Sequence, residues 1–255
     1  ADDGLELAVA DVATGASRTL TAAKLSGVLT TPCAWSESSA HVCLMRTEGK
    51  PPSKPVVPDG PAIQETRGGS APNPTYQDML QDPGDEAVFE HYATSRPVRI
   101  TLDGTAVPIG PWSLYRRVLP SPDGRYVMIQ KIARPFSYVV PFTRFATTTE
   151  IWNSDGTLAR RLADLPLQDG ISISNDARPI GPRDLEWKGG AASTLVWAEA
   201  KDQGNPANPA PKRDAVMLLS EPFAGAPHTF IQLEYRHFET EFTAEGEAYI
   251  AESWN

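Results

Sequence analysis

The residue types that carry chemistry are scattered along this chain of 255 residues. A hydrolase elbow of the form G-x-S-x-G holds a serine nucleophile on a strained turn between a strand and a helix. Its nearest approach here is Gly68-Gly69-Ser70-Ala71-Pro72, which lacks the last glycine and lies in a proline-rich stretch. No G-x-G-x-x-G or other glycine-rich phosphate loop is present, and most of the glycines are isolated in expected turns. The sequence therefore predicts no catalytic residue and no cofactor.

A metal site is not predicted either. His237, Glu239 and Glu241 alternate, so a strand would place them on one face. Successive members of that row would be about 7 Å apart, which is too far for one small ion. We expect a solvated strand face there, and solvated surface for the adjacent acids Asp85 and Glu86.

One connection combines arginine with aromatic residues. The stretch IARPFSYVVPFTR at 132–144 contains Arg134, Phe136, Tyr138, Phe142 and Arg144. Such residues in a loop can form a pocket that recognises an anion. The alternative is a hydrophobic loop that packs over its own sheet or a neighbouring domain. The sequence leaves both open.

Charge argues against nucleic acid as a partner. The formal net charge is −9, and a nucleic-acid binder needs a basic face. The pairs Arg116-Arg117 and Arg160-Arg161 both lie in strand contexts, where we expect solvated faces. No apolar run approaches the roughly 18 residues of a membrane span.

The two cysteines, Cys33 and Cys43, flank an expected turn at 36–40. In a hairpin centred there they fall nearly opposite one another, at a separation that a disulfide can span. Two buried thiols on adjacent strands are the alternative. An oxidised pair would imply an exported protein.

The elements that must position these residues are strands. Residues 119–165 contain two successive hairpins, with turns at Ser121-Pro122-Asp123-Gly124 and around Asp155-Gly156. The run YVMI at 126–129 is apolar at consecutive positions, so that strand is expected to be covered on both faces. A four-stranded antiparallel sheet covered on both faces is typical of one blade of a β-propeller.

Similar hairpins recur along the chain, with inner turns near residues 36, 121, 188 and 244. Once insertions are subtracted, the unit is close to the blade length of about 40–50 residues. We therefore predict an all-β partial β-propeller of four-stranded antiparallel blades with a short helical insertion. The predicted units are a half-blade at 1–24, blades at 25–112, 113–168 and 169–236, and a half-blade at 237–255.

The blade at 25–112 contains a proline-rich and helical insertion at 49–93. Helical spacing at 76–92 predicts two short helices, broken at Pro83-Gly84. The half-blades at both ends, and a polar start without a signal peptide, suggest a mature form or a piece of a longer protein.

Several segments together resemble the propeller portion of glutamyl endopeptidases, a branch of the prolyl-oligopeptidase clan of serine peptidases. They include PCAWSESSAHVC, TYQDMLQDPGDEAVFEHY, PSPDGRYVMIQKIARPFSYVVPFTRF, EIWNSDGTLARRLADLPL and TLVWAEAKDQGNP. The RPFSY-x-VP and ADLPL stretches are the specific ones, and the similarity covers most of residues 5–223.

The resemblance implies an exported, periplasmic or secreted enzyme in which a propeller caps a C-terminal α/β-hydrolase domain. That domain and its catalytic triad are absent from this sequence, so the chain alone is expected to be inactive. Its implied role is to gate access and to help recognise peptides cleaved after Glu. The candidate recognition residues, chosen by loop position and residue type, are Arg134, Tyr138, Arg144 and Arg183. The alternative is a stand-alone propeller-type module that binds a peptide or protein.

Overall fold

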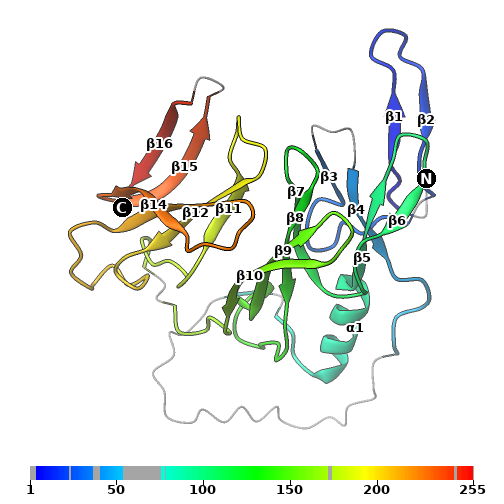
Figure 1. The fold of residues 1–255 in the computed structure, drawn as a ribbon. Coiled ribbons are helices and arrows are strands. Elements are labelled where there is room, and N and C mark those ends of the chain that lie inside the picture. Colours follow the sequence, from blue (N-terminus) through cyan, green and yellow to red (C-terminus); the bar gives the residue numbers. More distant parts are fainter. Residues whose placement is uncertain are drawn as a thin grey trace.

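The computed structural model describes residues 4–22, 24–36, 41–53, 76–77, 79–171, 174–243 and 246–254. Within these ranges, the strands form three four-stranded antiparallel sheets and two two-stranded hairpins, arranged side by side in chain order (Figure 1). The all-β prediction of four-stranded sheets is confirmed. In the described part of the chain, no helix is long and apolar enough to cross a membrane.

The strands follow one another in a regular order. The hairpins are β1 (Ala8–Ala10) with β2 (Ser17–Thr19), and β15 (Arg236–Phe242) with β16 (Ala248–Ser253). The first four-stranded sheet contains β3 (Cys33–Trp35), β4 (His41–Arg46), β5 (Ser95–Ile100) and β6 (Ala106–Pro108). The second contains β7 (Tyr115–Pro120), β8 (Tyr126–Ile132), β9 (Thr147–Asn153) and β10 (Leu158–Leu165). The third contains β11 (Arg183–Trp187), β12 (Thr194–Ala200), β13 (Asp214–Ser220) and β14 (His228–Leu233). The predicted division into blades stays a proposal.

Strand β8 shows why the apolar run at 126–129 is buried. Val127 and Ile129 belong to the hydrophobic layer shared with the first four-stranded sheet. Met128, which points the other way, belongs to the layer shared with the third sheet. Each face of the strand therefore packs on a different neighbouring sheet.

The same arrangement continues along the row of sheets. In β12, Leu195 and Trp197 face the second sheet, whereas Val196 faces the β15–β16 hairpin. Another layer, which includes Leu25 and Val98, joins the β1–β2 hairpin to the first four-stranded sheet. A hydrophobic layer thus lies between every pair of successive sheets, which is the packing of propeller blades.

One helix is present where the sequence predicted two. Helix α1 (Pro83–Ala93) is preceded by Asp82, whose side chain accepts a hydrogen bond from the backbone nitrogen of Asp85 at 2.8 Å. A proline at the first helical position is compatible with a helix, because its missing N–H has no intrahelical partner there anyway. Pro83-Gly84 therefore begins the helix and does not break one, and the described residues before Asp82 are not helical.

Three predicted features lie wholly or mostly outside the described residues: the Gly68–Pro72 stretch, the turn at 36–40 and the turn near 244. Around the first turn, the structure joins Cys33 and Cys43 in a disulfide. The two residues are direct partners on β3 and β4, with their Cα atoms 4.1 Å apart.

The two ends of the sheets differ. Short hairpin turns, such as those of β1–β2, β7–β8 and β11–β12, lie at the upper end in Figure 1. The connection from β8 to β9, the connection from β10 to β11 and helix α1 lie at the lower end. The longer connections therefore gather at one end of the molecule, which we call the long-loop end.

Candidate functional site

A cavity of about 410 Å³ opens between the second and third sheets and is rich in arginine. We call it the basic cavity. Its ionisable lining residues are Arg116, Arg117, Arg178, Arg183, Asp184 and His237, so four arginines face one carboxylate. In a chain with a net charge of −9, this local excess of positive charge is the opposite of the overall balance.

Three β-bulges aim these side chains. Strand β7 shifts register between Tyr115 and Arg117, and β11 shifts between Arg183 and Glu186. Strand β15 shifts between His237 and Glu239. A bulge places an extra residue on one strand and redirects its side chain, and bulges are over-represented beside active sites. Neighbouring residues such as Arg116 and Arg117 can therefore line the same cavity.

In the part of the chain that the structure describes, neither arginine of β7 forms an ion pair with a carboxylate. Nη1 of Arg116 donates to the carbonyl oxygen of Thr143 at 3.0 Å. Among the described residues, the guanidinium of Arg117 makes no hydrogen bond or ion pair, although the charges of Glu186 and Asp184 favour its protonated form. Burial lowers the pKa of both arginines, and Arg117 lowers that of Arg116 further. Arginine stays protonated in proteins, so both are half-buried cations that an anion would stabilise.

Arg183 is the most deeply placed of the four. It is 9% exposed and donates through Nη2 to the buried carboxylate of Asp214. Its Nη1 is buried and has no hydrogen-bond partner in the described part of the chain. Burial lowers the pKa of Arg183, although the charges of Asp214 and Asp184 oppose that effect. An unsatisfied buried donor of this kind is costly, and such groups often mark functional sites.

A hydroxyl, an imidazole and a carboxylate follow one another beside the cavity. His237 lies 2.8 Å through Nε2 from Oγ1 of Thr240, and 3.4 Å through Nδ1 from Oδ2 of Asp184. The order matches a catalytic triad, but Thr240 is only 6% exposed and does not line the cavity. A substrate carbonyl would not reach that hydroxyl, so we assign these contacts to holding His237.

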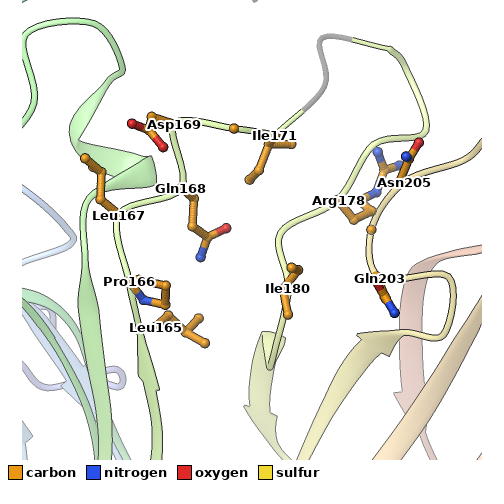
Figure 2. A pocket seen from close by; sticks show the side chains of 12 residues that line it. Leu165, Pro166, Leu167, Gln168, Asp169, Ile171, Arg178, Ile180, Gln203 and Asn205 are labelled. Atoms are coloured by element: carbon orange, nitrogen blue, oxygen red, sulfur yellow. The ribbon is translucent and has the colours of Figure 1, made fainter. Parts of the chain in front are cut away.

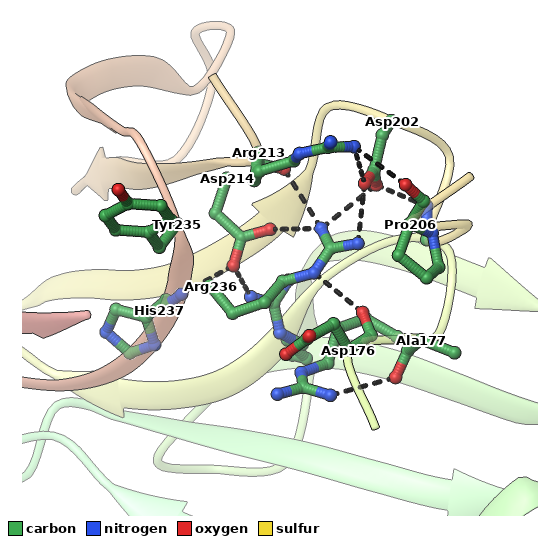
Figure 3. A network of polar contacts seen from close by, with 12 residues as sticks. Asp176, Ala177, Asp202, Pro206, Arg213, Asp214, Tyr235, Arg236 and His237 are labelled. Atoms are coloured by element: carbon green, nitrogen blue, oxygen red, sulfur yellow. Dashed lines mark hydrogen bonds and ion pairs between the residues drawn. The ribbon is translucent and has the colours of Figure 1, made fainter. Parts of the chain in front are cut away.

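A buried ionic network, shown in Figure 3, is joined to the basic cavity through the ion pair between Arg183 and Asp214. Arg236 is fully buried and pairs with Asp202 at 2.6 Å and with Asp214 at 3.0 Å. Its Nε donates to the carbonyl oxygen of Asp176 at 2.8 Å. Burial opposes its charge, but the hydrogen bonds to the two carboxylates outweigh burial and raise its pKa. The network fixes the start of β15 against the third sheet, and with it His237.

The predicted recognition residues separate into three places. Arg134 pairs with Glu86 and Glu90 of α1 at 2.7 and 2.8 Å, and Tyr138 hydrogen-bonds to the same Glu86. Arg144 lies over the ring of Tyr76, 5.6 Å from its centre, and donates weakly to the carbonyl oxygen of Ile171. Of the four candidates, Arg183 alone lines the basic cavity.

Two expectations of solvated strand faces hold only in part. Arg116 and Arg117 are half-buried in the cavity wall, whereas Arg161 is exposed. His237 is 8% exposed, whereas Glu239 and Glu241 are exposed as expected. The bulge between His237 and Glu239 breaks the expected alternation. A usable signal was in the sequence: the first strands of three successive units carry the charged pairs RR, RD and RH at 116–117, 183–184 and 236–237.

Across the described ranges, no group of three or more His, Cys, Asp and Glu side chains is placed to hold a metal ion. The four arginines that line the basic cavity can recognise an anion. A carboxylate suits this cavity, because a guanidinium can bind both carboxylate oxygens at once.

No family model matches the chain. Two curated proteins are similar in sequence, and both are named probable glutamyl endopeptidase, chloroplastic. The protein from Oryza sativa subsp. japonica is 37% identical over 98% of this chain, which spans 27% of that protein. The protein from Arabidopsis thaliana is 34% identical over 96% of this chain, which spans 26% of it.

Two solved structures are similar at 10% sequence identity. The structure of putative TolB from Agrobacterium tumefaciens has a TM-score of 0.41 and covers 97% of this chain and 61% of its own. The structure of acylaminoacyl peptidase in complex with Z-Gly-Gly-Phe-chloromethyl ketone has a TM-score of 0.46 and covers 93% of this chain and 30% of its own. On this sequence relationship, the chain corresponds to a propeller-like portion of the glutamyl endopeptidases, and it spans about a quarter of the length of these two relatives.

Proposed function

We propose that this chain is the non-catalytic propeller segment of a peptidase related to glutamyl endopeptidases, and that its basic cavity binds the carboxylate of an acidic peptide. The relatives' name supplies the substrate class, because an enzyme named for glutamyl bonds has to handle a glutamate side chain. The partners would be a hydrolase domain of the parent protein and the peptide.

One observation carries the proposal: the guanidinium of Arg117 lines the cavity without a hydrogen bond among the described residues, beside three further arginines. A peptide carboxylate would provide the missing acceptor. Hydrogen bonds to charged groups contribute about 1.5–3 kcal/mol, which corresponds to roughly a 10- to 150-fold change in affinity.

The position of the cavity supports a gating role. It is lined in part by Thr143, Gln168 and Arg178, which belong to the connections at the long-loop end, and by Leu165, the last residue of β10. Arg134 and Tyr138 tie the β8–β9 connection to α1 at that same end. We propose that these two residues position the helix and do not contact the peptide.

The binding test uses the purified chain and two blocked pentapeptides, Ac-Gly-Gly-Glu-Gly-Gly-NH₂ and its Gln counterpart. Calorimetry is expected to show tighter binding of the Glu peptide, and the difference should shrink as salt is added. Arg117→Gln should remove most of the preference. Arg46→Gln, which removes an exposed charge at the end of β4, is the matched control and should retain it. Equal affinity for the two peptides would refute the proposal.

A cleavage assay addresses the non-catalytic part of the proposal. The purified chain should leave the Glu peptide intact, since the hydroxyl of Thr240 is buried. Turnover that disappears in Thr240→Ala would show that the Thr240–His237–Asp184 contacts are catalytic and that this chain is an enzyme.

The compartment stays a prediction. The disulfide between Cys33 and Cys43 favours export into an oxidising environment, whereas the two relatives are named chloroplastic.

A further inference from the structure

A second cavity, of about 440 Å³, adjoins the basic cavity and is mainly apolar. Figure 2 shows its two walls: the segment at 165–169 on one side, and Arg178, Ile180, Gln203 and Asn205 on the other. Ile171 lies between the walls near the top of the view. We call it the apolar cavity, and Asp169 is its single carboxylate among the described residues.

The two cavities share a wall. Leu165, Gln168 and Arg178 line both of them. Arg178 therefore places a positive charge at the boundary between an apolar space and a space lined by three more arginines. A ligand that occupied both would need an apolar group beside an anionic one.

Close backbone contacts build the wall of the apolar cavity. The backbone nitrogen of Arg178 donates to the carbonyl oxygen of Gly204 at 2.9 Å. A Cβ at Gly204 would lie 2.0 Å from the carbonyl oxygen of Arg178, and one at Gly181 would lie 2.5 Å from Cδ2 of Leu165. Both glycines have positive φ values, 74° and 91°. The β10–β11 and β12–β13 connections are thus held together at positions that only glycine fits well.

We infer that the two cavities form one bipartite site, which binds an extended peptide with an acidic side chain in the basic cavity and an apolar side chain, two residues away, in the apolar cavity. Alternate side chains of an extended peptide point to the same side and are about 7 Å apart. Two such side chains could therefore enter two cavities that share a wall. The inference rests on the proposed function and adds a second determinant of specificity to it.

The test compares Ac-Gly-Gly-Glu-Gly-Gly-NH₂ with Ac-Leu-Gly-Glu-Gly-Leu-NH₂, which carries leucine two residues from Glu on both sides. The leucine peptide is expected to bind about tenfold more tightly, the lower end of what burial of one leucine side chain provides. A third peptide, Ac-Gly-Leu-Glu-Leu-Gly-NH₂, has leucine next to Glu and should gain much less.

Two variants test whether the apolar cavity provides the gain in affinity that the leucines give. Ile180→Ser removes apolar surface from the cavity wall at a residue that is 65% exposed, so the fold should tolerate it. It should abolish the gain from leucine and leave the affinity of the glycine peptide unchanged. Val107→Ser, at an exposed residue of β6, is the matched control and should retain the gain.

The outcomes separate this inference from the proposed function. A preference for Glu over Gln without any gain from leucine would overturn the bipartite site and leave the basic cavity standing. The bipartite site would also be overturned if the gain in affinity from leucine persisted in Ile180→Ser. The same holds if the peptide with leucines next to Glu showed an equal gain. Loss of the preference for Glu itself would overturn the proposed function.

Discussion

Replacement of Arg236 by methionine tests whether the buried ionic network holds β15 in place. Arg236 is fully buried and is the shared partner of Asp202 and Asp214, which are also fully buried. Arg236→Met keeps much of the side-chain volume but removes the charge and all four of its hydrogen-bonded partners: the two carboxylates and the carbonyl oxygens of Asp176 and Arg213. Two buried carboxylates then lose a cation.

Removal of one partner from a buried ionic group typically costs about 3–5 kcal/mol, because an uncompensated charge stays behind. Here Asp214 keeps Arg183, and Asp202 keeps Arg213, so we expect the lower part of that range. Urea denaturation followed by tryptophan fluorescence measures the loss. Hydrogen exchange should show its largest increase in β15 and β16, which the network anchors.

Arg125→Gln is the matched control. Arg125 also pairs with two carboxylates, Asp123 and Glu221, but its side chain is 54% exposed. Water replaces the lost contacts there, so the free energy of unfolding should change little. A loss below about 1 kcal/mol for Arg236→Met, or exchange that rises equally in all sheets, would show that the network does not anchor the hairpin.

Three further predictions concern the scaffold. The mass of the intact chain should rise by two hydrogens on reduction of the disulfide. The double variant Cys33→Ser, Cys43→Ser should lose about 2–3 kcal/mol of stability, because the disulfide closes a loop with a sequence separation of 10. Two free thiols in the purified chain would contradict this prediction. Burial lowers the pKa of His41, so below about pH 6.5 the unfolded chain binds a proton that the folded chain does not. Stability should therefore fall as the pH drops through that value, and less steeply in His41→Phe. Gly204→Ala should lower the free energy of unfolding by more than about 1 kcal/mol, because φ is 74° and the added Cβ would lie 2.0 Å from a carbonyl oxygen. Gly170→Ala is the control and should change stability little, because the space around Gly170 is open.

Much of the scaffold could be predicted from the sequence. Consecutive apolar residues at 126–129 indicated a strand covered on both faces, and Val127 and Met128 do belong to different hydrophobic layers. Asp-Gly turns marked the hairpins because the glycine at 124 or 156 adopts the positive φ that such turns need. Local chemistry and period-two alternation suffice for features of this kind.

The site could not be predicted in the same way. Its residues lie on bulges, where alternation fails, so Arg117 and His237 were assigned to the wrong surroundings. Arg178 comes from a connection whose path depends on contacts with Gly204 in another connection. The helix was misjudged for a different reason, because Pro83 has opposite effects at the first position of a helix and in its middle.

The bulges separate the chemistry of this protein from its stability. Residues 116–117, 183–184 and 237–238 lie where the ladder is interrupted, whereas the apolar side chains that join the sheets sit farther along the same strands or on their partners. At residues 116 and 117, which make no ion pair with the described carboxylates, an exchange would alter which ligands the basic cavity attracts while the contacts between the sheets stay intact. The same framework is therefore open to new ligand preferences through a handful of substitutions, and a library randomised at 116, 117 and 178 is a direct way to select them.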